Sequence, residues 1–174
     1  EIADAAIAFV EGGKRLRPQF CFAGWLVAGG DPDEPGIVPP AASLEWLQGS
    51  ALVHDDLMDG SDTRRGRPAV HREFEARHRR AGRVGDPAGF GESVAVLLGD
   101  LMLSWCDELF RDSTLPTVPR ALTYLDLCKT EVVAGQFLDV VGQTRSTLSV
   151  DEAMRVVRFK SAKYTVERPL HIGA

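Results

Sequence analysis

The apolar residues of this chain recur at helical spacing almost everywhere, and no stretch alternates between apolar and polar residues for long enough to build a β-sheet. A helix with one apolar face must bury that face against other helices, so the periodicity predicts an all-α helical bundle with short connections. The chain has 174 residues, of which 44% are hydrophobic and 26% are charged, as is typical of one packed globular domain. We therefore expect a single all-α domain over residues 1–174.

Glycine and proline residues divide the chain into the expected helices. The first helix is expected to end at Gly12-Gly13, and a capping box formed by Ser149 and Glu152 is expected to start the last one, which carries Lys160 toward its end. The other helices are expected over residues 18–28, 39–59, 92–111 and 118–142. Residues 60–91 are predicted to be a long loop with at most one short helix, over residues 71–80.

Composition excludes several classes of protein. The three cysteines, Cys21, Cys106 and Cys128, are widely spaced in apolar surroundings, as expected for reduced core residues of a cytoplasmic protein. The longest charge-free stretch, residues 18–30, is too short to span a bilayer. The net charge is −5, which argues against nucleic acid as a partner, although arginines are concentrated between residues 64 and 83.

An acidic cluster at the end of one expected helix is the first candidate site. In the run HDDLMD at residues 54–59, the carboxylates of Asp55 and Asp59 are one helical turn apart. A helix C-terminus disfavours acidic side chains, so a cationic partner is expected nearby. Carboxylates supply the hard oxygen ligands that Mg²⁺ takes when it also binds substrate phosphates. Asp55, Asp56 and Asp59 are therefore candidate Mg²⁺ ligands, and the alternative is a solvated acidic helix end.

Two basic runs complete the pattern. The run TRRGRP at residues 63–68 places arginines on a turn just beyond the aspartates, and guanidinium forks match phosphate oxygens. Carboxylates, Mg²⁺ and arginines together indicate a diphosphate pocket. The run GGKRLRP at residues 12–18 places further cations at a helix start, where anions bind well, and its alternative is a solvated turn between helices.

Five motifs in this order resemble the trans-isoprenyl diphosphate synthases, and in particular the bacterial geranylgeranyl-type polyprenyl synthases. They are GGKRLRP at 12–18, HDDLMDGSDTRRGRP at 54–68, Gly99-Asp100, GQFLD at 135–139 and FKSAKYT at 159–165. The resemblance covers essentially the whole chain. It implies the isoprenoid-synthase helical fold, of which residues 1–174 would be the N-terminal part, and a Mg²⁺-dependent homodimer.

The resemblance also implies the residues of the ionisation site. Asp55, Asp56 and Asp59 would bind the Mg²⁺ ions that hold the diphosphate of the allylic substrate. Arg64 and Lys160 would contact the same diphosphate, and with Asp55 and Asp59 they form the implied catalytic set. Metal and guanidinium charge would stabilise the departing diphosphate as an allylic carbocation forms.

The second substrate implied by the resemblance is isopentenyl diphosphate, whose double bond would attack that cation head-to-tail before a proton is lost. Its diphosphate would be held by Lys14, Arg17, Gln48 and Arg65. The residues implied to line the site near the nascent cation are Gln136, Asp139 and Ser161. The product would be a polyprenyl diphosphate.

One departure from the family leaves alternatives open. Family members carry a second aspartate-rich motif on a later helix, and no such motif follows Lys160. We therefore expect the chain to be part of a longer enzyme with little activity alone, or else a non-catalytic fragment or regulatory partner of a complete synthase. The pair His54-Asp55 also admits an HD-type metal phosphohydrolase, whose other histidine ligands would have to come from His71, His78 and His171.

Product length is expected to depend on the residues one and two turns before Asp55, where the growing prenyl tail would lie. Ser50 and Ala51 are small and leave the first turn open, whereas Leu47 and Trp46 would form a floor one turn further along. The expected product is geranylgeranyl diphosphate, with longer chains as the alternative. The alternative interpretation of Trp46 is an ordinary core aromatic that points away from the prenyl tail.

Overall fold

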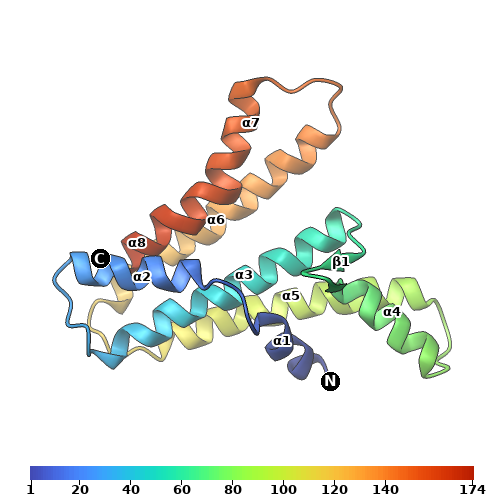
Figure 1. Cartoon of the computed structure of the whole chain (residues 1–174), viewed down its shortest axis with the longest axis horizontal. Helices are drawn as coiled ribbons and strands as arrows, with labels where there is room; N and C mark the ends of the chain where they lie inside the picture. Colours follow the sequence, from blue (N-terminus) through green and yellow to red (C-terminus); the bar gives the residue numbers. More distant parts are fainter. The chain divides into compact units, whose positions relative to one another are not determined.

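The computed structural model describes all 174 residues, which form two compact units (Figure 1). Unit 1 contains residues 1–13 and 46–106, and unit 2 contains residues 14–45 and 107–174. Each unit is therefore built from two separate segments of the sequence. The prediction of one domain over residues 1–174 stays a prediction.

The chain is predominantly helical, which confirms the predicted all-α class. The α-helices are α1 (Ile2–Val10), α2 (Leu16–Val27), α3 (Val38–Met58), α4 (Val70–Arg80), α5 (Pro87–Arg111), α6 (Val118–Gln143), α7 (Val150–Val156) and α8 (Arg168–Gly173). A 3₁₀ turn, η1 (Pro35–Ile37), precedes α3, and a π-helical stretch, η2 (Val157–Glu167), joins α7 to α8. The strands are β1 (Thr63–Arg64) and β2 (Arg67–Pro68), which pair antiparallel.

The predicted loop over residues 60–91 is wrong at both ends. Residues 63–68 form the β1–β2 hairpin, which is too short to show any alternation of apolar and polar residues. At the other end, α5 begins at Pro87 instead of Glu92. The carboxylate of Asp86 accepts hydrogen bonds from the backbone N–H groups of Ala88 and Gly89 over 3.0 Å each, so Asp86 caps the helix five residues earlier than expected.

The last predicted helix starts where expected and ends later. Ser149 accepts a hydrogen bond from the N–H of Glu152, whose side chain accepts one from the N–H of Ser149, which confirms the capping box. Lys160 was expected near the helix end, but η2 and α8 continue the helix to Gly173. Pro169 does not stop it, because Pro169 lies in the first turn of α8, where a missing N–H costs little.

Unit 1 packs α1, α4 and parts of α3 and α5 around one apolar core. Its buried members are Ala6, Val53, Val70, Phe74, Ala95, Leu98 and Met102. The C-terminal half of α3, which carries the aspartates, contributes Val53 to this core and is thereby fixed against α5. The acidic cluster therefore directly follows the packed part of α3.

Unit 2 brings helix backbones into direct contact. A Cβ atom on Gly24 of α2 would lie 2.1 Å from the carbonyl oxygen of Leu170 in α8, and one on Gly173 would lie 1.8 Å from that of Cys21. α6 packs along η2 and α8, so α6 and the helical segment from α7 to α8 run side by side (Figure 1). α2 and α8 can therefore approach this closely only because Gly24 and Gly173 have no side chains.

The cysteines are buried and not disulfide-bonded, as predicted for core thiols. Burial raises the pKa of the Cys21 thiol to about 12, so this side chain is packed as a neutral group. No helix of the chain combines the length and the apolar character needed to cross a membrane.

Replacing Gly24 with alanine is expected to lower the free energy of unfolding by about 1–3 kcal/mol, because the new methyl group meets backbone atoms of α8 that cannot rotate away. Gly142→Ala in α6 is the matched control, since a Cβ there would lie 3.7 Å from its nearest neighbour, the side chain of Leu148. That change is expected to be neutral or to stabilise by about 0.5–1 kcal/mol. Urea unfolding measures both, and equal stabilities would contradict the close α2–α8 contact.

Candidate active site

The acidic cluster lies at the C-terminal end of α3, and one arginine contacts two of its three carboxylates. Nε of Arg64 donates to Oδ1 and Oδ2 of Asp56 over 2.9 and 3.1 Å, and Nη2 donates to Oδ1 of the same carboxylate. Nη2 also lies 3.5 Å from Oδ2 of Asp55. The hydrogen bonds to Asp56 raise the pKa of the Arg64 guanidinium above its ordinary value. The cationic partner expected from the helix C-terminus is therefore Arg64.

The three aspartates occupy different environments. Asp56 is 1% exposed and faces Arg64, whereas Asp55 is partly exposed and Asp59 is exposed. The N–H of Asp59 donates to the carbonyl oxygen of Asp55 over 2.9 Å, which keeps these two residues one turn apart. Arg64 therefore contacts the carboxylate of Asp56, and the assignment of Asp55, Asp56 and Asp59 as Mg²⁺ ligands stays a prediction.

The pair Asp55 and Asp59 fits a Mg²⁺ ion that shares its coordination with a substrate. No three His, Cys, Asp or Glu side chains in the chain lie close enough together to hold a metal ion by themselves. Mg²⁺ is usually bound through one or two carboxylates, with phosphate oxygens and water completing the octahedron. Two accessible carboxylates one turn apart meet that requirement.

A tight hairpin directs Arg64 back onto the end of α3. In the β1–β2 pair, Arg64 lies opposite Arg67, and the two residues between them are Arg65 and Gly66. Their φ angles are +53° and +76°, the left-handed backbone that two-residue hairpin turns require. Arg15 is the other non-glycine residue with a positive φ, at +53°. Both basic runs therefore contain backbone strain, which often accompanies functional sites.

His54, next to the acidic cluster, packs against α5. Its Nε2 lies 3.2 Å from the carbonyl oxygen of Val96 and 3.7 Å from Oδ1 of Asp100. Gly99 leaves room for the ring, because a Cβ there would lie 2.1 Å from Nε2. The Gly99-Asp100 motif therefore receives His54 and joins the end of α3 to α5.

In unit 2, the predicted site residues gather along α6 and η2. Lys160 of η2 forms a 2.5 Å ion pair with Asp139 of α6. Arg17 of α2 donates to Oγ1 of Thr165 over 2.8 Å, and its guanidinium lies 4.0 Å from the ring centroid of Tyr164. η2 therefore carries one residue predicted for the allylic substrate and contacts one predicted for isopentenyl diphosphate.

The other predicted substrate contacts are divided between the units. In unit 2, Nε2 of Gln136 is buried and has no hydrogen-bond partner within the chain, while Lys14 and Ser161 are exposed. A buried amide N–H without a partner costs about 1–3 kcal/mol, which a bound acceptor would recover. Gln48 and Arg65 belong to unit 1.

Comparison with known proteins identifies the family of the chain. The family model for polyprenyl synthetase matches residues 1–174. The chain belongs to the polyprenyl synthetase family. This membership confirms the resemblance seen in the five motifs, and it excludes the HD-type phosphohydrolase.

Relatives in the family differ in the product that their names give. The (2E,6E)-farnesyl diphosphate synthase of Mycobacterium tuberculosis (strain ATCC 25618 / H37Rv) is 33% identical over 150 residues, which are 86% of this chain and 37% of that protein. The geranylfarnesyl diphosphate synthase of Natronomonas pharaonis is 34% identical over 167 residues, covering 87% of this chain and 44% of that protein. The names alone therefore do not assign a product length.

A solved structure of geranylgeranyl pyrophosphate synthase from Corynebacterium glutamicum, complexed with isoprenyl diphosphate and magnesium, has the same fold. Its TM-score is 0.91 at 42% identity, and the match covers 98% of this chain and 51% of that one. The chain thus spans about half the length of this polyprenyl synthetase and less than half of the two relatives above.

The predicted product-length residues lie in the half of α3 that belongs to unit 1. Ser50 and Leu47 are 4% and 3% exposed, and Ala51 is partly exposed. Trp46 packs edge-on against Trp105 of α5, with ring centroids 5.0 Å apart and planes at 73°. Trp46 is partly buried and packs against the core of unit 1, and its role in product length stays a prediction; any floor that it forms would be an aromatic pair rather than one ring.

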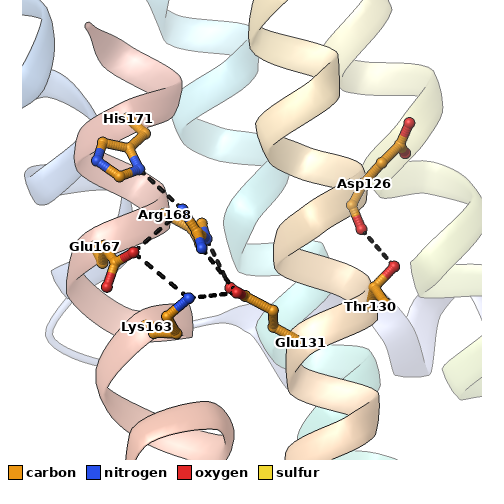
Figure 2. A network of polar contacts seen from close by, with 7 residues as sticks. All are labelled: Asp126, Thr130, Glu131, Lys163, Glu167, Arg168 and His171. Atoms are coloured by element: carbon orange, nitrogen blue, oxygen red, sulfur yellow. Dashed lines mark hydrogen bonds and ion pairs between the residues drawn. The ribbon is translucent and has the colours of Figure 1, made fainter.

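Sequence analysis missed a second charged cluster, in unit 2. The carboxylate of Glu131 in α6 accepts hydrogen bonds from Arg168 and Lys163, as Figure 2 shows. One signal was available, because Glu131 follows the apolar residues Leu125 and Cys128 on the buried face of α6. The sequence did not indicate a role for Arg168, because a single arginine after the motif FKSAKYT at residues 159–165 has no distinctive spacing.

Replacing Asp56 with asparagine is expected to lower the free energy of unfolding by about 1–3 kcal/mol, because the half-buried Arg64 loses its charged partner. Asp55→Asn, which alters a partly exposed carboxylate 3.5 Å from Arg64, is the matched control and is expected to cost under about 1 kcal/mol. Urea unfolding of the two variants measures the difference. A larger loss from Asp55→Asn would contradict the division of roles between these neighbours.

Proposed function

We propose that this chain forms part of a Mg²⁺-dependent trans-prenyltransferase that condenses isopentenyl diphosphate with an allylic diphosphate, head-to-tail, to give a polyprenyl diphosphate. The observation that carries the proposal is the accessible pair Asp55 and Asp59 beside Arg64, whose position is fixed by buried Asp56. Family membership supports the reaction class. The proposal includes a homodimer in the cytoplasm, as the resemblance implies.

Each residue of the proposed site has a separate task. Asp55 and Asp59 would hold Mg²⁺, which supplies positive charge against the departing diphosphate. The Arg64 guanidinium, already oriented by Asp56, would donate from its remaining N–H groups to diphosphate oxygens. Lys160 would add a second cation on the same diphosphate, in exchange for or beside its contact with Asp139.

The second substrate would be bound by Lys14, Arg17, Gln48 and Arg65. Arg17 is oriented in advance by Tyr164 and Thr165, so little side-chain entropy is lost when its guanidinium meets a phosphate. The unpartnered Nε2 of Gln136 would find its acceptor near the reacting carbons, beside Asp139 and Ser161. Apolar walls would exclude water, which would otherwise quench the allylic cation.

Asp55→Ala and Asp59→Ala are each expected to lower kcat on the order of a hundredfold or more in the full-length protein, since each removes a metal ligand at the leaving diphosphate. Steady-state assays with labelled isopentenyl diphosphate measure the effect. Asp62→Ala is the matched control, because this exposed carboxylate pairs only with Arg72 on the surface. Near-normal turnover by Asp55→Ala would end the proposal.

The proposed product is geranylgeranyl diphosphate, because Ser50 and Ala51 leave the first turn before Asp55 without a bulky side chain. Ser50→Phe is expected to shorten the main product toward fifteen carbons, as measured by chromatography of the dephosphorylated products. Ala51→Phe, at a partly exposed position, repeats the test if the buried Ser50 site does not accept a phenyl ring. A wild-type product of fifteen carbons would contradict the small-residue argument.

A further inference from the structure

The segment that carries Lys160 is an unusual helix. η2 contains 11 residues in π-helical conformation, between the α-helical segments α7 and α8. A π-helix is rare beyond a single turn, and such stretches occur frequently at functional sites. The hydrogen bonds within η2 do not determine how η2 is aligned along α6. Contacts with neighbouring helices must therefore fix its position.

The first such contact is made by the backbones themselves. A Cβ on Gly135 of α6 would lie 2.3 Å from the backbone nitrogen of Lys160, 2.7 Å from its Cα and 2.7 Å from the carbonyl carbon of Phe159. These are backbone atoms, so no side-chain rotation would relieve the clash. Gly135 therefore permits η2 to touch α6 at Lys160 itself.

The second contact is the charged cluster around Glu131, one turn before Gly135 on α6. Nε and Nη2 of Arg168 donate to Oε2 and Oε1 of Glu131 over 2.6 and 2.7 Å, and Nζ of Lys163 donates to Oε1 over 2.5 Å. Figure 2 shows both cations pointing at this one carboxylate from the neighbouring helix. One acidic residue of α6 therefore holds two basic residues on either side of the junction between η2 and α8.

The rest of the cluster completes its charge balance. Oε1 of Glu167 lies 3.6 Å from Nζ of Lys163 and 3.2 Å from Nη1 of Arg168, and the same Nη1 lies 3.1 Å from Nδ1 of His171 (Figure 2). The hydrogen bonds from Arg168 and then from Lys163 lower the pKa of Glu131 to about 2. Glu131 is therefore ionised throughout the neutral range and does not act as an acid or base.

The charged cluster around Glu131 is too deeply buried to bind a substrate directly. Glu131 is 9% exposed and Arg168 is 7% exposed. A buried ion pair adds little net stability compared with well-packed apolar residues, because desolvation offsets the attraction between the charges. Its best-attested use is to specify one register of packing, since every other register leaves a buried charge unpaired.

We propose that Glu131 and Gly135 are positioning residues for Lys160: the charged cluster fixes the register of η2 on α6, and the glycine contact presents the Lys160 ammonium at Asp139. The inference rests on the proposed function for the part that concerns the allylic diphosphate. Neither residue touches substrate in this assignment; both act through the position of one lysine.

The test uses Gly135→Ala and Glu131→Gln in the full-length protein, with Gly142→Ala and Glu73→Gln as matched controls. Gly142 lies in the same helix with room for a methyl group, and Glu73 of α4 forms a surface ion pair with Arg77. Gly135→Ala is expected to raise KM for the allylic diphosphate about 10- to 100-fold and KM for isopentenyl diphosphate much less, because misplacement of about 1 Å has effects of this size. Glu131→Gln is expected to act in the same direction, and Glu131→Asp to restore part of the loss.

Hydrogen exchange of the backbone amides supplies a readout independent of activity. Exchange over residues 157–163 is expected to accelerate about tenfold or more in Gly135→Ala and Glu131→Gln, with the controls unchanged. The proposal would be overturned if both variants were less stable but kept wild-type KM values and wild-type exchange over this segment. The charged cluster would then contribute to stability alone. Lys160→Ala with normal kinetics would instead contradict the proposed function, and the exchange measurement would still decide the positioning of η2.

Discussion

A buried carboxylate that holds a cationic side chain is the interaction on which the candidate site residues of each unit depend. In unit 1, Asp56 is almost completely buried and binds the guanidinium of Arg64, which leaves the neighbouring Asp55 and Asp59 accessible. In unit 2, Glu131 is buried and binds Arg168 and Lys163, while Lys160 lies nearer the surface with Asp139. In each unit a buried acid fixes the geometry, and the residues proposed to meet substrate lie beside it.

This arrangement has a physical rationale. A buried charge without its partner costs several kcal/mol, so only the conformation that completes the pair is populated. An exposed ion pair gains little and exchanges readily with a substrate or metal ion. Cations that must be pre-positioned for a diphosphate are therefore best oriented by acids that water does not reach. The residues proposed to meet substrate can then exchange one partner for another.

Close helix contacts supply the second constraint. At Gly24, Gly135 and Gly173, a methyl group would meet backbone atoms of the facing helix at less than normal contact distance. Two of these contacts join α2 to α8, and the third joins α6 to η2 at Lys160. The rigid part of unit 2 is therefore built from backbone against backbone, which fixes helix positions more tightly than flexible side chains can.

The sequence by itself determined most of the helices, the capping box at Ser149, the one-turn spacing of Asp55 and Asp59, the need for a cation near them and the family. The helices, the cap and the spacing follow from patterns within single chain segments, which local hydrogen bonds convert directly into geometry. The family follows from five motifs distributed along the whole chain. Only the tertiary structure decided that Asp56 holds Arg64, that Trp46 packs on Trp105, and that Glu131 joins Lys163 and Arg168. These roles depend on burial and on partners distant in sequence, because the energy of a charge is set by what surrounds it and not by its neighbours in the chain.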